Sequence, residues 1–210
     1  EDESNVHREL ENNNDFRVVV SPEFYSGILL EQLKNRKIEN VINQNAEVVI
    51  YPYQNGDEML VNITKTKVED NSYTVSHRGS LTIITLDISD GGLRASDSLQ
   101  WIHLQNDIKN ANQNVLLVFK GNIDDFKDEM EKQLWIDVLC DIQKATNKNI
   151  WVIQKGDNID YSMKRGIKYL TISSHEFDDV TKEDIQNTNY IIITVSQDNM
   201  TYEIKNVFEK

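Results

Sequence analysis

The residue types that hold metal ions and carry out acid–base chemistry are unevenly represented in this chain. It contains 35 aspartates and glutamates, but four histidines and one cysteine. None of the histidines pairs with another at a spacing typical of zinc sites; they are His7, His77, His103 and His175. Cys140 falls within an amphipathic stretch, where a buried apolar role fits better than a reactive thiol. The G-x-S-x-G, G-x-G-x-x-G and Walker A patterns do not occur, so these residues alone indicate no enzyme.

Carboxylates are so frequent that close pairs arise by chance. Asp124-Asp125 is interpreted as a helix start and Asp178-Asp179 as a solvated acidic loop. With 22 lysines and arginines, the net charge is −13. This excess argues against nucleic acid and against anionic membrane surfaces, because both need clustered cations on the protein. No apolar run reaches the ~18 residues that span a bilayer, so no membrane insertion is expected.

The apolar runs predict which elements position these residues. Residues 16–20 and 48–51 have the character of buried strands, and the stretch between them, 28–42, has helical periodicity. Strand, helix and strand in this order predict a right-handed parallel crossover. A further strand is expected around residues 60–64. Strands at 73–76 and 81–86 are expected to form a hairpin.

The second half of the chain continues the alternation of helices and strands. A helix capped by Asp97 and carrying Trp101 on its apolar stripe is expected before residue 114. The longest helix is expected over 125–146, with an apolar stripe that includes Met130 and Leu134. The remaining expected strands are 114–119, 150–153, 167–172, 190–195 and 201–207. This pattern predicts an α/β layered fold.

The N-terminal residues differ in composition from the rest. Residues 1–14 are polar and acidic and lack the apolar core of a signal peptide. We therefore expect 1–15 to be a flexible segment or linker and 16–210 to form a single domain, cut from a longer protein. Abundant Asn and Ile with scarce Ala are typical of a low-GC bacterium.

One long stretch resembles the calcineurin-like metallophosphoesterase family. It comprises the Y-T-V-S-H-R-G-S-L-T-I-I-T-L-D strand pair at 73–87, the I-S-D-G-G-L-R-A-S-D loop at 88–97, and Q-W-I-H-L at 100–104. The resemblance continues downstream in the segments 115–119, 149–153, 165–171 and 193–203. It implies a four-layer αββα sandwich of two mixed sheets flanked by helices.

Family members bind two metal ions through Asp and His residues at strand ends, and a bridging hydroxide attacks phosphorus. In this chain the matching positions carry other residues, and every metal-binding histidine is missing. The Gly-Asn-His motif has no counterpart between Asp57 and Tyr73. The resemblance therefore implies a vestigial pocket with no catalytic residue and no metal ligand, formed by Ser21, Glu23, Gln54, Asp57, Lys120, Asn122, Lys155 and Asp157.

Three hypotheses follow for function. The leading one is a catalytically inactive metallophosphoesterase-like module without cofactor, which acts as a binding or structural domain of a bacterial surface or secreted protein. Its partner would be a protein, another domain of the same chain or a cell-wall glycan. The second is a phosphoesterase whose rebuilt site holds Mg²⁺ or Mn²⁺ through Glu23, Asp57 and Asp157. The third is a module that uses Lys120 and Lys155 to hold a phosphate or sugar phosphate without cleaving it. The sequence indicates no oligomeric state.

Overall fold

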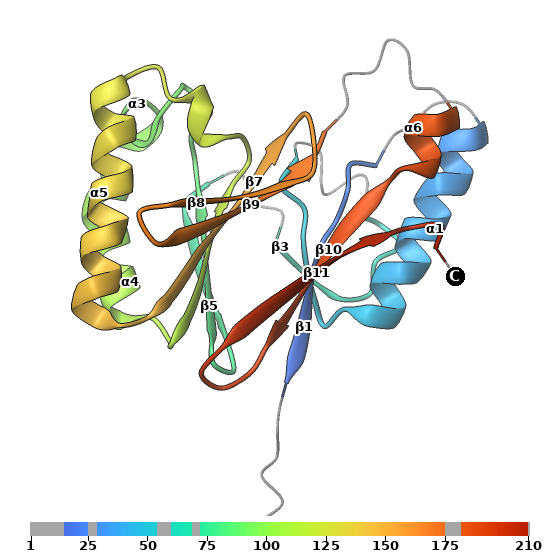
Figure 1. The fold of residues 1–210 in the computed structure, drawn as a ribbon, viewed down its shortest axis with the longest axis horizontal. Coiled ribbons are helices and arrows are strands. Elements are labelled where there is room, and N and C mark those ends of the chain that lie inside the picture. The colour runs from blue at the N-terminus through green and yellow to red at the C-terminus, as the bar shows by residue number, and fades with distance from the viewer. Residues whose placement is uncertain (1–14, 25–28, 54–59, 69–71, 175–181, 210) are drawn as a thin grey trace, which may run out of the picture.

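Two mixed β-sheets pack face to face, and helices cover both outer faces (Figure 1). The computed structural model describes residues 15–24, 29–53, 60–68, 72–174 and 182–209. Helices α3, α4 and α5 lie outside the six-stranded sheet, while α1 and α6 lie outside the five-stranded sheet (Figure 1). The predicted α/β class and the four-layer αββα architecture are confirmed.

The five-stranded sheet combines strands from the N-terminal and C-terminal parts of the domain. Its strands are β1 (Phe16–Val20), β2 (Val48–Ile50), β3 (Thr66–Val68), β10 (Asn189–Val195) and β11 (Met200–Asn206). They lie in the order β11-β10-β1-β2-β3. Strand β1 pairs in parallel with β2, with α1 (Leu29–Asn45) between them, so the predicted parallel crossover is confirmed. On its other side β1 pairs antiparallel with β10, with Phe16 opposite Val195.

The strand expected around residues 60–64 is wrong in position. Leu60 and Ile63 are buried but lie in a turn, in which the Ile63 N–H donates to the Leu60 carbonyl at 3.0 Å. Strand β3 begins later, at Thr66. The apolar side chains of this turn pack into the core although its backbone is not extended. In the sequence, such a turn and a short buried strand give the same pattern of apolar residues.

The six-stranded sheet comes from one continuous part of the chain. Its strands are β4 (Thr74–Arg78), β5 (Leu81–Leu86), β6 (Asn114–Phe119), β7 (Asn149–Gly156), β8 (Asp160–Lys164) and β9 (Ile167–Ser173). They lie in the order β4-β5-β6-β7-β9-β8. Strands β5, β6, β7 and β9 are parallel, so their carboxyl ends meet at one edge. Strands β4 and β8 pair antiparallel at the two sides.

The helix boundaries differ from those that the sequence predicts. Helix α3 (Leu93–Asp97) and helix α4 (Gln100–Asn110) are separate. Asp97 therefore ends α3 instead of capping α4, and its Oδ1 accepts from the Leu99 N–H at 2.9 Å. Helix α5 (Glu129–Thr146) begins later than expected, because Asp128 is its N-cap and residues 123–125 form a separate 3₁₀ turn. The short helix α6 spans Lys182–Gln186.

The buried apolar side chains form two cores. One core lies between the two sheets and beneath α1, and the other lies between the six-stranded sheet and α3, α4 and α5. Within the second core α5 buries Trp135 completely, whereas Met130 and Leu134 are 84% and 49% exposed. The expected stripe is therefore wrong at Met130 and Leu134, because the large indole of Trp135 takes the position over the sheet. Its members Leu139 and Ile142 are buried as expected.

None of the helices in the described part of the chain combines the length and the apolar character that a membrane span requires.

Candidate functional site

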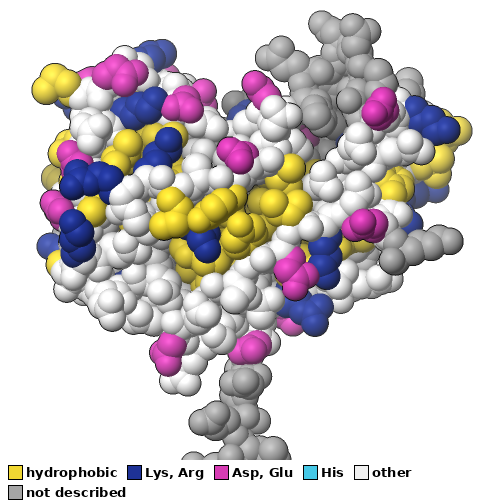
Figure 2. All heavy atoms as spheres, in the orientation of Figure 1, with side chains coloured by type: hydrophobic (Ala, Val, Ile, Leu, Met, Phe, Trp, Pro, Cys, Tyr) yellow, Lys and Arg dark blue, Asp and Glu magenta, His cyan; other side chains and the backbone are white. Residues whose placement is uncertain are grey.

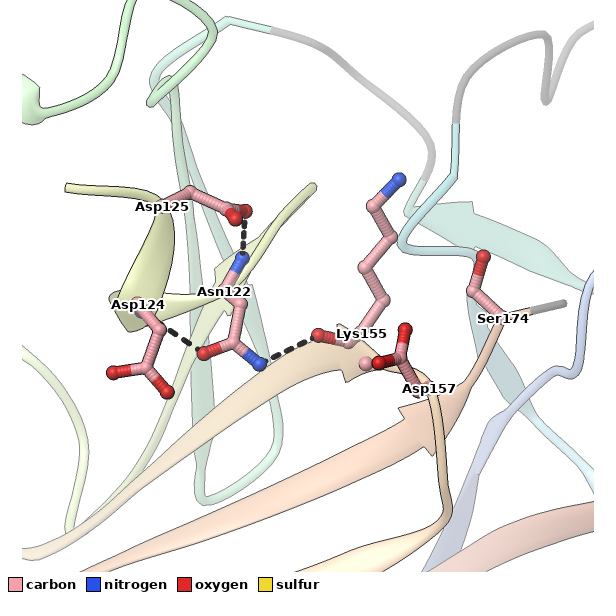
Figure 3. Close-up of a pocket in the computed structure, with 7 residues that line it drawn as sticks. Asn122, Asp124, Asp125, Lys155, Asp157 and Ser174 are labelled. Carbon is pink, nitrogen blue, oxygen red and sulfur yellow. Dashed lines mark hydrogen bonds between the residues drawn. The ribbon is translucent and has the colours of Figure 1, made fainter. Parts of the chain in front are cut away.

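An open cavity of about 440 Å³ lies where the parallel strands of the six-stranded sheet end (Figure 3). Asn122 follows β6, Lys155 and Gly156 end β7, and Ser174 follows β9. This is the edge at which ligands of α/β proteins usually bind. The lining residues are Asn122, Asp124, Asp125, Lys155, Gly156, Asp157 and Ser174.

Asn122 links two of the strand ends. Its Nδ2 donates to the Lys155 carbonyl at 2.8 Å, and its Oδ1 accepts from the Asp124 N–H at 3.0 Å. Its own N–H donates to Asp125 Oδ2 at 2.7 Å, which completes a capping box around the 3₁₀ turn. Both ends of the Asn122 amide are thus committed to backbone groups, as the dashed lines in Figure 3 show.

A second amide, which is buried, repeats this arrangement near the cavity. Gln154 is 4% exposed, its Oε1 accepts from the Ile123 N–H at 3.1 Å, and its Nε2 donates to Thr171 Oγ1 at 3.1 Å. The Lys155 N–H donates to the Gly121 carbonyl at 3.0 Å. A Cβ atom at Gly121 would come within 2.8 Å of Asp125 Oδ2, so the loop after β6 packs too closely for a larger residue.

Two of the three cavity carboxylates have partners within the protein. Asp124 Oδ1 lies 2.5 Å from Lys132 Nζ, and this hydrogen bond lowers the pKa of Asp124. Asp125 accepts the Asn122 N–H, while Asp157 is exposed. Among the residues that the structure describes, no three Asp, Glu, His or Cys side chains are grouped so that they could hold a metal ion. Asp57, one of the three carboxylates of the second hypothesis, lies outside the described residues.

Three of the sequence-predicted residues come together here. Asn122, Lys155 and Asp157 line the cavity, and Glu23 adjoins it because its Oε2 accepts from the Ser174 hydroxyl at 2.9 Å. The Lys155 amino group extends away from the loop after β6 in Figure 3.

The other predicted residues are not brought into the lining. Ser21 is fully buried, and its hydroxyl donates to the Pro22 carbonyl at 2.8 Å. Lys120 is half-buried after β6 and does not line the cavity. Gln54 and Asp57 lie outside the described residues.

Sequence reasoning missed several residues of this region. Asp124 and Asp125 were interpreted only as a helix start, and Ser174 carried no signal, because its place depends on where β9 ends. Lys34, on α1, is 3% exposed. Burial lowers the pKa of Lys34 to about 8, and the charges of Glu31 and Glu23 oppose this shift. The periodicity of α1 contains no sign that this lysine is buried.

We expect Asn122→Ala to lower the free energy of unfolding by about 2 kcal/mol, because an N-cap and a cross-strand hydrogen bond are lost together. The measurement is urea-induced unfolding. The control is Asn158→Ala, since Asn158 is exposed and directly follows the lining residue Asp157 in the sequence. Its truncation should change stability by less than about 0.5 kcal/mol. Equal effects of the two variants would contradict a structural role of Asn122.

Comparisons with known proteins identify the fold. No protein-family model matches the sequence, and a search of curated proteins finds no match. The chain is similar to the structure of GAP50, the anchor in the inner membrane complex of Plasmodium, with a TM-score of 0.57 and 8% identity over 93% of this chain and 85% of that chain. This likeness shows the fold alone.

Two further structures are less similar. A predicted phosphoesterase from Streptococcus pneumoniae has a TM-score of 0.43 and 10% identity over 92% of this chain and 90% of that chain. Vacuolar Protein Sorting 29 from Cryptosporidium parvum has a TM-score of 0.43 and 11% identity over 93% of this chain and 99% of that chain. At these TM-scores neither adds to the assignment of the fold.

Proposed function

We propose that the chain is a catalytically inactive metallophosphoesterase-like module that acts as a binding or structural domain of a larger bacterial surface or secreted protein. The observation that carries the proposal is the use of Asn122. At the strand end where the resemblance implies metal-binding histidines, this side chain joins the loop after β6 to the end of β7. A side chain held by two backbone partners braces the fold, and its amide N–H and one lone pair of its oxygen are already used within the protein.

The buried Gln154 supports the same conclusion. It stands where the resemblance implies the last histidine motif, and both ends of its amide are hydrogen-bonded within the protein. A buried amide satisfied at both ends stabilises the packing of β7 against its neighbours. Residues at or beside the positions that would carry the chemistry in an active member are thus used to connect strands.

The second hypothesis, a rebuilt metal site, gains one supporting observation. Three carboxylates, those of Asp124, Asp125 and Asp157, line the same cavity. Two of them are engaged, by Lys132 and by the Asn122 N–H. Hard cations need several oxygen ligands directed at one point, so this arrangement supports the hypothesis weakly.

The third hypothesis, phosphate binding by Lys120 and Lys155, is less favoured by the charges. Lys155 lines the cavity together with three carboxylates, which repel an anion, and Lys120 is not a lining residue. We expect Lys120→Ala with Lys155→Ala to leave inorganic phosphate binding unchanged in isothermal titration, at the level of a buffer blank. Saturable binding that the double variant loses would support this hypothesis over the leading one.

The likeness to GAP50 agrees with a role without catalysis. That protein is described as an anchor, so this fold occurs in a protein with an attachment role. For this chain we propose a comparable attachment or scaffolding role, with a protein or a cell-wall glycan as partner.

The decisive experiment is thermal unfolding with Mn²⁺, Mg²⁺, Zn²⁺ and Ca²⁺, each against a chelator control. We expect no metal-specific rise of the melting temperature. A metal ion bound to the folded state alone, at a hundredfold excess over its dissociation constant, would add about 2.7 kcal/mol of stability. For a chain of this size that is a rise of roughly 5–10 °C.

The matched control is Asp157→Asn, because Asp157 is exposed in the cavity and its replacement should not affect folding. A metal-specific rise that disappears in Asp157→Asn would overturn the proposal and favour the rebuilt site. Hydrolysis of bis(p-nitrophenyl) phosphate with Mn²⁺, above the rate of this variant, would overturn it as well.

A further inference from the structure

The layer between the two sheets reaches the surface on one side of the sandwich. There the last strand of the six-stranded sheet, β8, lies near the last strand of the other sheet, β11, since the rings of Tyr161 and Tyr202 stack with centroids 5.8 Å apart. We call this surface the edge patch, and it consists of Trp151, Tyr161, Met163, Lys168, Tyr202 and Ile204. Figure 2 shows hydrophobic side chains gathered in the middle of this face, with basic side chains among them.

The register of the strands explains why these side chains share one face. Lys168 on β9 lies opposite Trp151 on β7 and opposite Met163 on β8, so the three form a row across neighbouring strands. Residues two apart on a strand share a face, and Leu170 belongs to the core between the sheets. Lys168 therefore faces into the inter-sheet layer at its open side.

The edge patch is apolar but exposed. Tyr161 is 41%, Met163 54% and Ile204 42% exposed, while Trp151 forms the buried floor at 8%. Exposed apolar side chains that are contiguous, and not scattered singly, are typical of interaction sites.

Lys168 is held within this patch by aromatic rings. Its Nζ lies 4.2 Å from the ring centroid of Trp151, 5.0 Å from that of Tyr202 and 5.6 Å from that of Tyr161. Aromatic faces attract a cation but accept its N–H groups poorly. Burial lowers the pKa of Lys168, as expected of an ammonium group that has lost part of its water.

In the part of the chain that the structure describes, Lys168 belongs to none of the ion pairs, which involve Arg94, Lys132, Arg165 and Lys205. This is unexpected in a chain with a net charge of −13, in which acidic side chains outnumber basic ones. A partly desolvated cation without a carboxylate partner is complementary to a carboxylate brought by a ligand.

The backbone of β8, at the edge patch, can also form hydrogen bonds to a ligand. Among the described strands β8 is the last of its sheet and pairs only with β9, so its outer N–H and C=O groups can bond to a further strand. Extended peptides bind many proteins by adding to such an edge, with alternate side chains directed into pockets. A strand added to β8 would place alternate side chains over Tyr161 and Met163.

We propose that the edge patch docks an extended peptide segment that adds to β8, with an aspartate or glutamate side chain against Lys168 and apolar side chains over Tyr161 and Tyr202. This site uses none of the residues that line the strand-end cavity, so it is independent of whether that cavity is active. It gives the proposed binding module a partner of defined chemistry, an acidic and apolar strand of another protein or domain.

Two other occupants fit the patch less well. A second copy of this chain, docked by two-fold symmetry, would bring the same patch of each copy together and so place both Lys168 ammonium groups in one interface. A glycan would stack on ring faces, but the Lys168 ammonium already lies over the rings of Trp151 and Tyr202. A bound glycan would also leave the β8 backbone unused.

The test starts from a phage-displayed library of random peptides of about seven residues, the length of a typical strand. Peptides enriched on the wild type are synthesised, and their affinities are measured by fluorescence anisotropy. We expect an acidic residue among apolar ones, and a loss of about tenfold or more with Lys168→Met, which keeps the apolar stem. Lys205→Met is the matched control, because it removes the same charge from β11 where Lys205 pairs with Glu203.

The peptide itself provides the second half of a double-mutant cycle. Replacing the acidic residue of the peptide by the corresponding amide should weaken binding to the wild type. The same replacement should have little further effect on the affinity for Lys168→Met. Binding should also slow hydrogen exchange of the β8 amides.

Several outcomes would overturn the proposal. No enrichment above an unrelated protein, or equal affinity for wild type and Lys168→Met, would remove the peptide site. Binding of chitohexaose that Tyr161→Ala abolishes and Lys168→Met retains would assign the patch to a glycan. Self-association of Lys168→Met with no peptide binding by the wild type would show that Lys168 only protects an edge strand.

Discussion

Replacing Trp135 by alanine is expected to lower the free energy of unfolding by about 3–5 kcal/mol. The indole is fully buried under α5, and its ring centroid lies 4.9 Å from that of Phe119. Its Nε1 donates to the Tyr169 hydroxyl at 2.9 Å, so the variant also leaves that buried hydroxyl without its donor. Urea-induced unfolding followed by far-UV circular dichroism measures the loss.

The control on the same helix is Met130→Ala. Met130 is 84% exposed, and its truncation should change the stability by less than about 0.5 kcal/mol. A cost for Met130→Ala equal to that of Trp135→Ala would mean that Met130 also packs on the sheet, as the apolar stripe of the sequence predicts.

The second large effect is a rise of stability with pH that depends on Lys34. Its pKa falls from 10.5 to about 8 on folding, so between these pH values the unfolded chain binds more protons at this side chain than the folded one. The free energy of unfolding therefore rises with pH in that window, by roughly 3 kcal/mol from this group. Below pH 8 the full cost of burying the charge is present.

Buried tyrosines limit the rise at its upper end. Burial raises the pKa of Tyr51 and of Tyr169 to about 12, so above pH 10 the unfolded chain loses these protons first and stability falls. We expect a maximum of stability near pH 10 in urea titrations between pH 7 and 11. Lys34→Met should remove the rise, whereas Lys144→Met, at an exposed position of α5, should keep it. A rise that persists unchanged in Lys34→Met would refute the assignment.

Much of the fold could be predicted because parallel strands buried on both faces have continuous apolar sequences. The strand at 114–119 was predicted at its observed limits for this reason. Strand β8 was not predicted, because Asp160, Ser162 and Lys164 alternate with two exposed apolar residues and the segment has no buried face. Met130 was wrongly placed in the buried stripe of α5 because Met130 and Trp135 are both apolar, and only the shape of the sheet chooses between them.

For the candidate site, the sequence predicted which residues lie at strand ends, but not which hydrogen bonds they make. Asn122, Lys155 and Asp157 were placed at strand ends, and they do line one cavity. The sequence contained no sign that Asn122 would bond to the Lys155 carbonyl, because that contact depends on how closely two loops approach. Whether the cavity is a vestigial phosphoesterase pocket stays a prediction.

The position of β1 between β2 and β10 has a consequence for biosynthesis. Phe16 pairs with Val195, so the five-stranded sheet cannot close until nearly the whole domain has left the ribosome. At typical elongation rates that delay is on the order of ten seconds or more, whereas the six-stranded sheet, contained in residues 74–173, can assemble earlier. During this interval β1 lacks its antiparallel partner, and the apolar side chains of β10 are missing from the shared core. The yield of folded protein should therefore depend on translation speed and on chaperones that shield the nascent N-terminal strands.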